Sequence, residues 1–124
     1  MKKLNYFITG GTGSFAKEFI KNLVKKNNFK KIIIFSRDEY KQEILKNMQF
    51  VKKHFRKFRF FIGDVRDKDR LNFAIQEDVD ILIHAAALKQ VPTSEYNPFE
   101  TIKTNVVGAQ NVIQVCLEKN IKKV

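Results

Sequence analysis

Short apolar runs alternate along the chain with longer segments in which apolar positions recur every three or four residues. Four runs, at residues 5–9, 31–35, 59–62 and 80–84, are apolar at nearly every position, which is typical of parallel strands buried on both faces of a sheet. The longer segments predict four amphipathic helices. The residues that mark them are Phe15, Phe19, Ile20, Leu23 and Val24; Tyr40, Ile44, Leu45 and Met48; Leu71, Ala74 and Ile75; and Ile102, Val106, Ala109, Ile113 and Leu117.

The fourth helix has the clearest boundaries. Asn97 is suited to its N-cap, Pro98 to its first helical position, and Asn120 to its end. Residues 121–124 resemble the approach to a fifth strand. Strands that alternate with helices at this spacing predict right-handed βαβ units. The expected fold is therefore α/β, a Rossmann-like doubly wound parallel sheet that takes up residues 1–124 as a single domain.

Between the first strand and the first helix lies the sequence TGGTGSFA. Glycine at such a turn lets the pyrophosphate of a dinucleotide approach the backbone N–H groups at the positive end of the helix. Gly10 permits the tight turn, Gly13 the close contact, and Ala16 is the small residue where the helix packs on the sheet. Glycine-rich turns also occur for structural reasons alone, but the position between strand and helix favours a phosphate-binding loop.

The end of the second strand predicts which dinucleotide is bound. Sites for NAD place an acidic residue there, whereas sites for NADP use cationic and hydroxyl groups around the 2′-phosphate. Ser36 and Arg37 end this strand and Lys41 follows one helical turn later, which favours NADP. In the alternative interpretation, Asp38 caps the second helix, and Arg37 and Lys41 are ordinary surface charges. Asp38 also leaves NAD binding open.

Two further strand ends fit the same ligand. After the third strand, Asp64 could accept a hydrogen bond from the adenine amino group and Val65 could pack on the adenine ring, although Asp64 could equally cap a turn. After the fourth strand, Ala85, Ala86 and Ala87 offer small side chains along the path of a ribose and nicotinamide. Close packing explains three alanines equally well.

Charge is unevenly distributed along the 124 residues. Residues 1–59 carry 16 Lys and Arg against 4 Asp and Glu, a net charge of +12, whereas residues 60–124 carry 8 against 9, a net charge of −1. Such a field attracts nucleotides and nucleic acids alike, but a solvated lysine-rich surface is the favoured interpretation. The lone Cys116 is expected to be buried, and His54 and His84 belong to no metal-ligand cluster. No apolar run is long enough to span a membrane.

A family resemblance rests on the segments TGGTGSF, SRDEYKQ, FFIGDVRD, HAAALKQVP and EYNPFETIKTNVVGAQNV. They resemble the extended short-chain dehydrogenase/reductase superfamily, and most of all its inverting UDP-N-acetylglucosamine 4,6-dehydratases, over the whole chain. The resemblance implies that the chain is the N-terminal, NADP-binding part of such an enzyme. The implied cofactor contacts are Thr12, Gly13, Ser14 and Phe15 at the pyrophosphate, Ser36, Arg37 and Lys41 at the 2′-phosphate, Asp64 and Val65 at adenine, Ala86 along the cofactor, and Lys89 at the cofactor ribose or substrate. Asn105 matches a structural asparagine, and Ala16 stands where the family often has glycine.

The reaction implied by the resemblance is an internal redox dehydration of the sugar. Hydride passes from C4 to NADP, water is eliminated across C5 and C6, and hydride returns to C6 with inversion at C5. The family's Asp-Lys pair and Tyr-x-x-x-Lys motif would lie beyond Val124, because none of Tyr6, Tyr40 and Tyr96 has a lysine four residues later. We therefore expect no catalytic residue, and no dehydratase activity, in these 124 residues alone.

UDP-N-acetylglucosamine is the substrate that the resemblance implies. The open edge of an incomplete parallel sheet, at the fourth strand, predicts a homo-oligomer. Since the sequence shows no membrane-spanning run, no signal peptide and no recognised nucleic-acid motif, we expect no membrane or nucleic-acid partner and a place in the cytoplasm. A related epimerase or a dTDP-glucose type of dehydratase is the alternative within the enzyme class. A standalone NADP-binding module and a basic nucleic-acid binder are the alternatives outside it.

Overall fold

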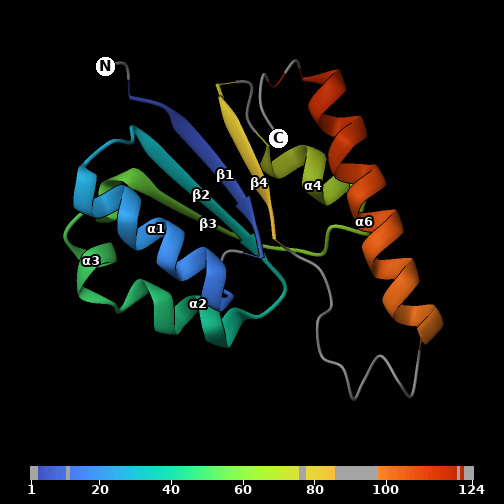
Figure 1. The fold of residues 1–124 in the computed structure, drawn as a ribbon, viewed down its shortest axis with the longest axis horizontal. Coiled ribbons are helices and arrows are strands. Elements are labelled where there is room, and N and C mark those ends of the chain that lie inside the picture. The colour runs from blue at the N-terminus through green and yellow to red at the C-terminus, as the bar shows by residue number, and fades with distance from the viewer. Residues whose placement is uncertain (1–2, 11, 76–77, 86–97, 120, 122–124) are drawn as a thin grey trace.

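The described part of the chain forms one parallel sheet in the order β3-β2-β1-β4 (Figure 1). The computed structural model describes residues 3–10, 12–75, 78–85, 98–119 and 121, and within residues 98–106 the backbone alone. The strands are β1 (Asn5–Thr9), β2 (Lys31–Ser36), β3 (Phe58–Ile62) and β4 (Ile81–His84). All neighbouring pairs are parallel. The predicted α/β class is confirmed, and each predicted strand agrees with the observed one to within a residue at either end.

Helices cover both faces of this sheet (Figure 1). The helices α1 (Ser14–Lys26), α2 (Glu39–Lys46) and α3 (Gln49–Lys52) lie on one face, and α4 (Lys68–Ala74) and α6 (Pro98–Glu118) lie on the other. A short 3-10 helix, η1 (Phe55–Lys57), leads into β3. The connections β1-α1-β2 and β2-α2-β3 step in one direction across the sheet, and the connection through α4 returns to the opposite side of β1. This is the strand order of the first half of a doubly wound fold.

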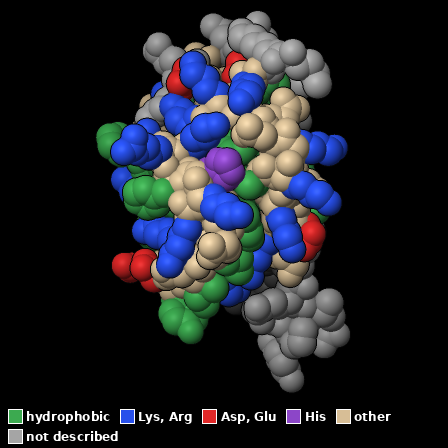
Figure 2. Space-filling view, turned by 90° about the vertical axis from the view of Figure 1, so that its left-hand side faces the viewer, with side chains coloured by type: hydrophobic (Ala, Val, Ile, Leu, Met, Phe, Trp, Pro, Cys, Tyr) green, Lys and Arg blue, Asp and Glu red, His purple; other side chains and the backbone are tan. Residues whose placement is uncertain are grey.

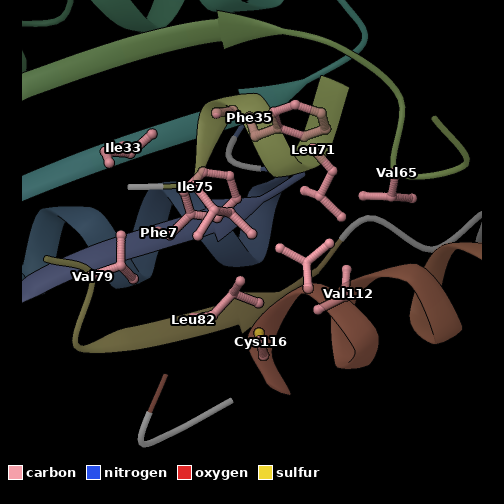
Figure 3. Close-up of a cluster of buried hydrophobic side chains, with 12 residues drawn as sticks. Phe7, Ile33, Phe35, Val65, Leu71, Ile75, Val79, Leu82, Val112 and Cys116 are labelled. Carbon is pink, nitrogen blue, oxygen red and sulfur yellow. The ribbon is translucent and has the colours of Figure 1, made fainter. Parts of the chain in front are cut away.

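Each face of the sheet has its own core because successive side chains of a strand point to opposite sides. Tyr6 and Ile8 of β1 belong to the cluster under α1, α2 and α3, whereas Phe7 belongs to the cluster under α4 and α6. Figure 3 shows Phe7 in the second cluster with side chains from β2, β4 and both helices. The labelled members of that cluster are Phe7, Ile33, Phe35, Val65, Leu71, Ile75, Val79, Leu82, Val112 and Cys116.

The helix α6 turns a different side to the core from the one expected. Ile113 and Leu117 were predicted on its apolar stripe, but 55% and 74% of their surfaces are exposed. Among the side chains that the structure describes for this helix, those of Val112, Val115 and Cys116 are buried instead. The sequence of this helix is apolar on more than one side, so periodicity alone could not select the packed face. The predicted burial of Cys116 is confirmed, and burial raises the pKa of its thiol.

A glycine explains why this particular face of α6 packs inward. A Cβ atom on Gly108 would lie 2.5 Å from Cγ2 of Val65, which is closer than real side chains approach. Asn111, on the same helix, donates through Nδ2 to the carbonyl oxygens of Val65 and Arg66 at 2.8 and 3.1 Å. Close contact at the glycine and hydrogen bonds from the asparagine therefore hold the loop after β3 against α6.

The second predicted helix is shorter than expected. The periodic positions predicted one helix through Met48, but α2 ends at Lys46 and the separate α3 follows. Tyr40 and Ile44 are exposed, whereas Gln42 and Leu45 are buried. Among the described residues, none of the helices is long and apolar enough to cross a bilayer.

Candidate functional site

The glycine loop lies where the strand order of the sheet reverses. It follows β1, which has β2 on one side and β4 on the other, and ligands of doubly wound folds bind outside the carboxyl ends of the strands at this point. Gly10 has a φ of 67°, in the left-handed region that favours glycine, and its N–H donates to the carbonyl oxygen of Phe35 at 2.8 Å. The turn is therefore fixed to the end of β2 before α1 begins.

The N-terminus of α1 is arranged to receive an anion. Its N-cap is Gly13, no side chain of the described residues caps it, and its first turn contains no acidic residue. By contrast, the carboxylates of Asp38 and Asp67 cap α2 and α4. Among the described residues, a Cβ atom on Gly13 would meet only the Gly10 carbonyl oxygen at 3.5 Å, an ordinary contact, so the packing that the structure describes does not require glycine here. The first turn of a 13-residue helix thus offers its N–H groups to a ligand.

The other predicted loop residues differ in exposure. Thr12 is buried, and Ser14 and Phe15 are exposed. The ring of Phe15 stacks on Phe19 with centroids 6.3 Å apart. Ala16 is buried between α1 and the sheet, in the place expected for a small residue.

The end of β2 is tied to the end of β3 by a buried glutamine. Gln42, which is 2% exposed, donates through Nε2 to Ser36 Oγ at 2.8 Å and to the carbonyl oxygen of Phe61 at 2.9 Å. Ser36 is itself buried, so its hydroxyl lies below the surface while it can still donate its own hydrogen. The sequence pattern did not indicate a role for Gln42. Its position three residues before Leu45, on the same side of α2, is the signal that could have identified it.

Replacing Gln42 by alanine should lower the free energy of unfolding by about 2 kcal/mol, because the buried Ser36 hydroxyl and Phe61 carbonyl lose their donor. Urea denaturation measures the change. Gln114→Ala is the matched control, since Gln114 is exposed on α6, and it should change stability by less than about 0.5 kcal/mol. Equal effects of the two substitutions would contradict the assigned role.

Charged residues follow Ser36 at the rim of the site. Arg37 is exposed over 52% of its side chain, and Lys41 is exposed on α2. Asp38 Oδ1 accepts a hydrogen bond from the Lys41 backbone N–H at 3.0 Å, so Asp38 caps α2 as the alternative interpretation predicted. This cap does not occupy the guanidinium of Arg37 or the ammonium of Lys41.

At the end of β3, Asp64 is held by an arginine that the sequence analysis missed. Its Oδ1 accepts from the Arg66 backbone N–H at 2.9 Å, and its Oδ2 accepts from Arg66 Nε and Nη2 at 3.1 and 2.9 Å. Arg37 Nη1 lies 3.8 Å from the same oxygen. Burial alone would raise the pKa of Asp64, but the hydrogen bonds and charge of Arg66, with the charge of Arg37, outweigh it and hold the pKa below its ordinary value.

This lowered pKa predicts how stability depends on pH. The stabilisation from ionised Asp64 is fully present above the unfolded-state pKa of 3.8 and is lost as the pH falls through the lower pKa of the folded state. Asp64→Asn should cost about 1 kcal/mol at neutral pH, allowing for partial exposure of the pair. In urea titrations, the difference between the parent protein and Asp64→Asn should shrink below about pH 4. A constant difference would contradict the assignment.

The ends of β1 and β4 are joined by Thr9 and His84. Thr9 Oγ1 lies 2.7 Å from His84 Nδ1 and accepts a hydrogen bond from the Ala85 backbone N–H at 3.1 Å. With a neutral imidazole, either the Thr9 hydroxyl donates to Nδ1 or the Nδ1–H donates to the hydroxyl, because Oγ1 can accept a second hydrogen bond. Burial lowers the pKa of His84, which favours the same neutral form. Ala85 is half-buried beside this pair.

The remaining predicted site residues are of two kinds. Val65 is buried and packs against Gly108, so the contact that the structure describes for its side chain is with the protein. Ala86 and Lys89 lie outside the described residues, as do Ala87, Tyr96 and Asn97, and so does the side chain of Asn105. The described residues contain no cluster of histidine, cysteine and carboxylate side chains that could hold a metal ion.

Comparisons with known proteins agree with this architecture. Residues 6–124 match the family described as "Polysaccharide biosynthesis protein". A UDP-N-acetylglucosamine 4,6-dehydratase (inverting) of Campylobacter jejuni is 54% identical over 119 residues, which is 96% of this chain and 34% of that protein. A UDP-glucose 4-epimerase of Rickettsia typhi is 47% identical over 120 residues, 94% of this chain and 34% of that protein.

A solved structure has the same fold. The X-ray structure of Pen from Bacillus thuringiensis superimposes with a TM-score of 0.85 and 39% identity, over 99% of this chain and 36% of that one. The chain thus spans about a third of the length of the relatives that it matches. From the family match and this fold, the chain belongs to the polysaccharide biosynthesis protein family, within the extended short-chain dehydrogenase/reductase superfamily.

Proposed function

We propose that this chain is the NADP-binding part of a UDP-N-acetylglucosamine 4,6-dehydratase that inverts C5 and works in the cytoplasm. The observation that carries the proposal is the exposed, uncapped N-terminus of α1 behind Gly10 and Gly13, at the strand switch point beside Arg37. The 54% identity to the Campylobacter jejuni dehydratase supports the substrate and the reaction. The chain spans about a third of that relative. Residues 1–124 would therefore supply the cofactor site, and a further part of the protein would supply the sugar site and the catalytic groups.

The residues of the site fit a dinucleotide with a 2′-phosphate. NADP would accept hydride from the sugar and return it. The N–H groups of the first turn of α1 would bind the pyrophosphate, because the helix dipole and the absence of an acidic residue in that turn favour a dianion. Gly13 would keep the approach open, and Thr12, Ser14 and Phe15 would surround it. Ala85 and Ala86 would leave room for the ribose, and Lys89 would reach the ribose or the sugar.

The cationic end of β2 supports NADP over NAD. Asp38, the acidic residue in a position to bind a ribose 2′-hydroxyl, already uses Oδ1 to cap α2. The exposed guanidinium of Arg37 and the exposed Lys41 remain to pair with a 2′-phosphate. Asp64 and Val65 would adjoin the adenine. Because Asp64 also binds Arg66, the orientation of both arginines would depend on this carboxylate.

Calorimetric titration with NADP and NAD tests the proposed cofactor. The intact protein should bind NADP at least about tenfold more tightly, and Arg37→Ala should remove this preference while leaving NAD binding unchanged. Lys21→Ala is the matched control, since Lys21 is an exposed cation on α1 away from the loop, and it should keep the preference. Tighter binding of NAD would refute the choice of NADP, and failure to bind either would refute the dinucleotide site.

A second candidate, a nucleotide-sugar 4-epimerase, is favoured by the 47% identity to the Rickettsia typhi protein. Incubation of the intact protein with UDP-N-acetylglucosamine and with UDP-glucose separates the two. The dehydratase forms a 4-keto-6-deoxy product, visible by NMR as a new C6 methyl signal, whereas an epimerase changes only the configuration at C4.

A further inference from the structure

Two long segments of the chain contain no acidic residue. Residues 19–37 and residues 44–63 each carry six Lys and Arg and no Asp or Glu. They lie in different βα units, so their charges are separated along the sequence. Whether they act as one surface depends on where the fold places them.

The fold brings these segments together at the amino ends of the strands. The ring of Phe29, which is fully buried before β2, lies 5.5 Å from the ring of His54 and 6.1 Å from that of Phe58. Lys57 Nζ lies 5.0 Å from the centre of the Phe29 ring. The C-terminal end of α1 and the loop to β2 are therefore packed against the stretch that joins α3 to β3.

We call the resulting surface the basic edge. Figure 2 shows Lys and Arg side chains gathered over this face, with few Asp and Glu among them. Its exposed cations are Lys25, Lys26, Lys30, Lys52, Lys53 and Arg56. Two carboxylates lie at the β1 and β4 end of the same edge: Asp78 is paired with Lys31 at 2.9 Å, and Asp80 accepts from the Asn5 backbone N–H at 2.8 Å.

The basic edge also contains an exposed aromatic ring. Phe55, on η1, is 62% exposed, whereas its neighbours Phe29 and Phe58 are buried. It lines a shallow cavity of about 340 Å³ together with Lys52, Lys53, His54, Arg56 and Lys57. Phe55 thus adds an apolar group to a part of the surface that is otherwise lined by cations and His54.

We propose that the basic edge docks on an anionic phospholipid bilayer, with Phe55 entering the interface between headgroups and acyl chains. Each Lys or Arg near such a surface strengthens binding about fivefold, and an inserted apolar side chain adds to this. The edge lies at the opposite ends of the strands from the glycine loop, so a docked protein would keep its candidate cofactor site open to water. No apolar run of these 124 residues is long enough to span a membrane. The proposed contact is with the membrane surface, and it departs from the expectation of no membrane partner.

A nucleic acid fits this surface less well. Proteins that bind single strands use a groove with successive aromatic side chains for stacking, and the part of the edge that the structure describes presents only Phe55 in exposed form. Proteins that read duplexes insert a helix or ribbon, whereas α3 has four residues and η1 three. The cation cluster with one protruding ring therefore favours a lipid surface.

The absence of tryptophan from the chain makes a direct test possible. Phe55→Trp introduces the one tryptophan of these 124 residues at an exposed position, and its emission is compared with that of the unsubstituted protein. With vesicles of phosphatidylcholine and phosphatidylglycerol in equal parts, we expect co-sedimentation and a blue shift of tryptophan emission. With phosphatidylcholine alone, or in high salt, both should be absent.

Charge-reversal variants separate the basic edge from the general positive charge. Lys52→Glu with Lys53→Glu should reduce binding to the anionic vesicles by at least about tenfold. Lys17→Glu with Lys21→Glu makes the same change of charge on the first two turns of α1, outside the basic edge, and should reduce binding far less. Equal losses in the two variants, binding without a blue shift, or binding to an oligonucleotide but not to vesicles would each overturn the proposal.

Discussion

Replacing Gly13 by valine should weaken NADP binding about 100-fold or more, equivalent to about 2.7 kcal/mol, while leaving the stability of the fold nearly unchanged. Gly13 has φ −75° and ψ 168°, a conformation that valine adopts readily. Of the atoms that the structure describes, a Cβ atom there would contact only the Gly10 carbonyl oxygen at 3.5 Å, and the remaining space is where the pyrophosphate would lie. The added methyl groups would therefore exclude the ligand and not disturb the protein. Calorimetry measures the affinity and thermal unfolding the stability.

Gly10→Val is the control variant for this experiment. Gly10 has a positive φ of 67°, so valine there strains the backbone and should lower stability and binding together. If Gly13→Val destabilised the fold as much as Gly10→Val does, the loop would be a structural turn. Unchanged NADP affinity in a folded Gly13→Val protein would mean that the pyrophosphate does not bind at this loop.

Replacing Gly108 by leucine should destabilise the protein by about 3 kcal/mol, the upper range for overpacking a core. Even the Cβ atom of an alanine would lie 2.5 Å from Val65 Cγ2, and a leucine side chain extends further into the same contact. The helix would have to move away from the loop after β3, which would break the hydrogen bonds from Asn111 to Val65 and Arg66. Urea denaturation measures the loss.

A double-mutant cycle isolates the contact itself. Gly108→Ala alone should destabilise the protein despite the higher helix propensity of alanine, and Val65→Ala alone should do so by opening a cavity. The two together should cost less than the sum of the single changes, by about 1 kcal/mol or more, since the smaller residue 65 makes room for the new methyl group. Additive effects would mean that the close approach at Gly108 does not determine how α6 packs against the loop after β3.

Local patterns were sufficient to predict the strands, the glycine loop and the fold class. A strand buried on both faces, as β1 and β2 are, must be apolar at almost every position, and this requirement can be read from five residues without knowledge of their neighbours. The expected burial on both faces is wrong for β3 and β4, which are only partly buried. The prediction for Gly10 also needed only local sequence, because a positive φ depends on the backbone of one turn. Asp38, as an N-cap three residues before the N–H that it accepts from, is also a local feature.

The tertiary structure decided which side of each helix is buried and which polar groups are paired. Helix α6 is apolar on more than one side, and its contact with Val65 at Gly108 selects Val112 and Cys116 over Ile113 and Leu117. The burial of Gln42 depends on where the ends of β2 and β3 meet.

Charges were the hardest feature to place from the sequence. The cations of the basic edge, at residues 25–30 and 52–56, form one surface only because Phe29 packs against His54 and Phe58. The sequence pattern of a segment determines which local structure it can form, because the preferences for strands, turns and helix caps act between near neighbours. The partners of a side chain across the fold depend on distances that arise only when all the elements have packed.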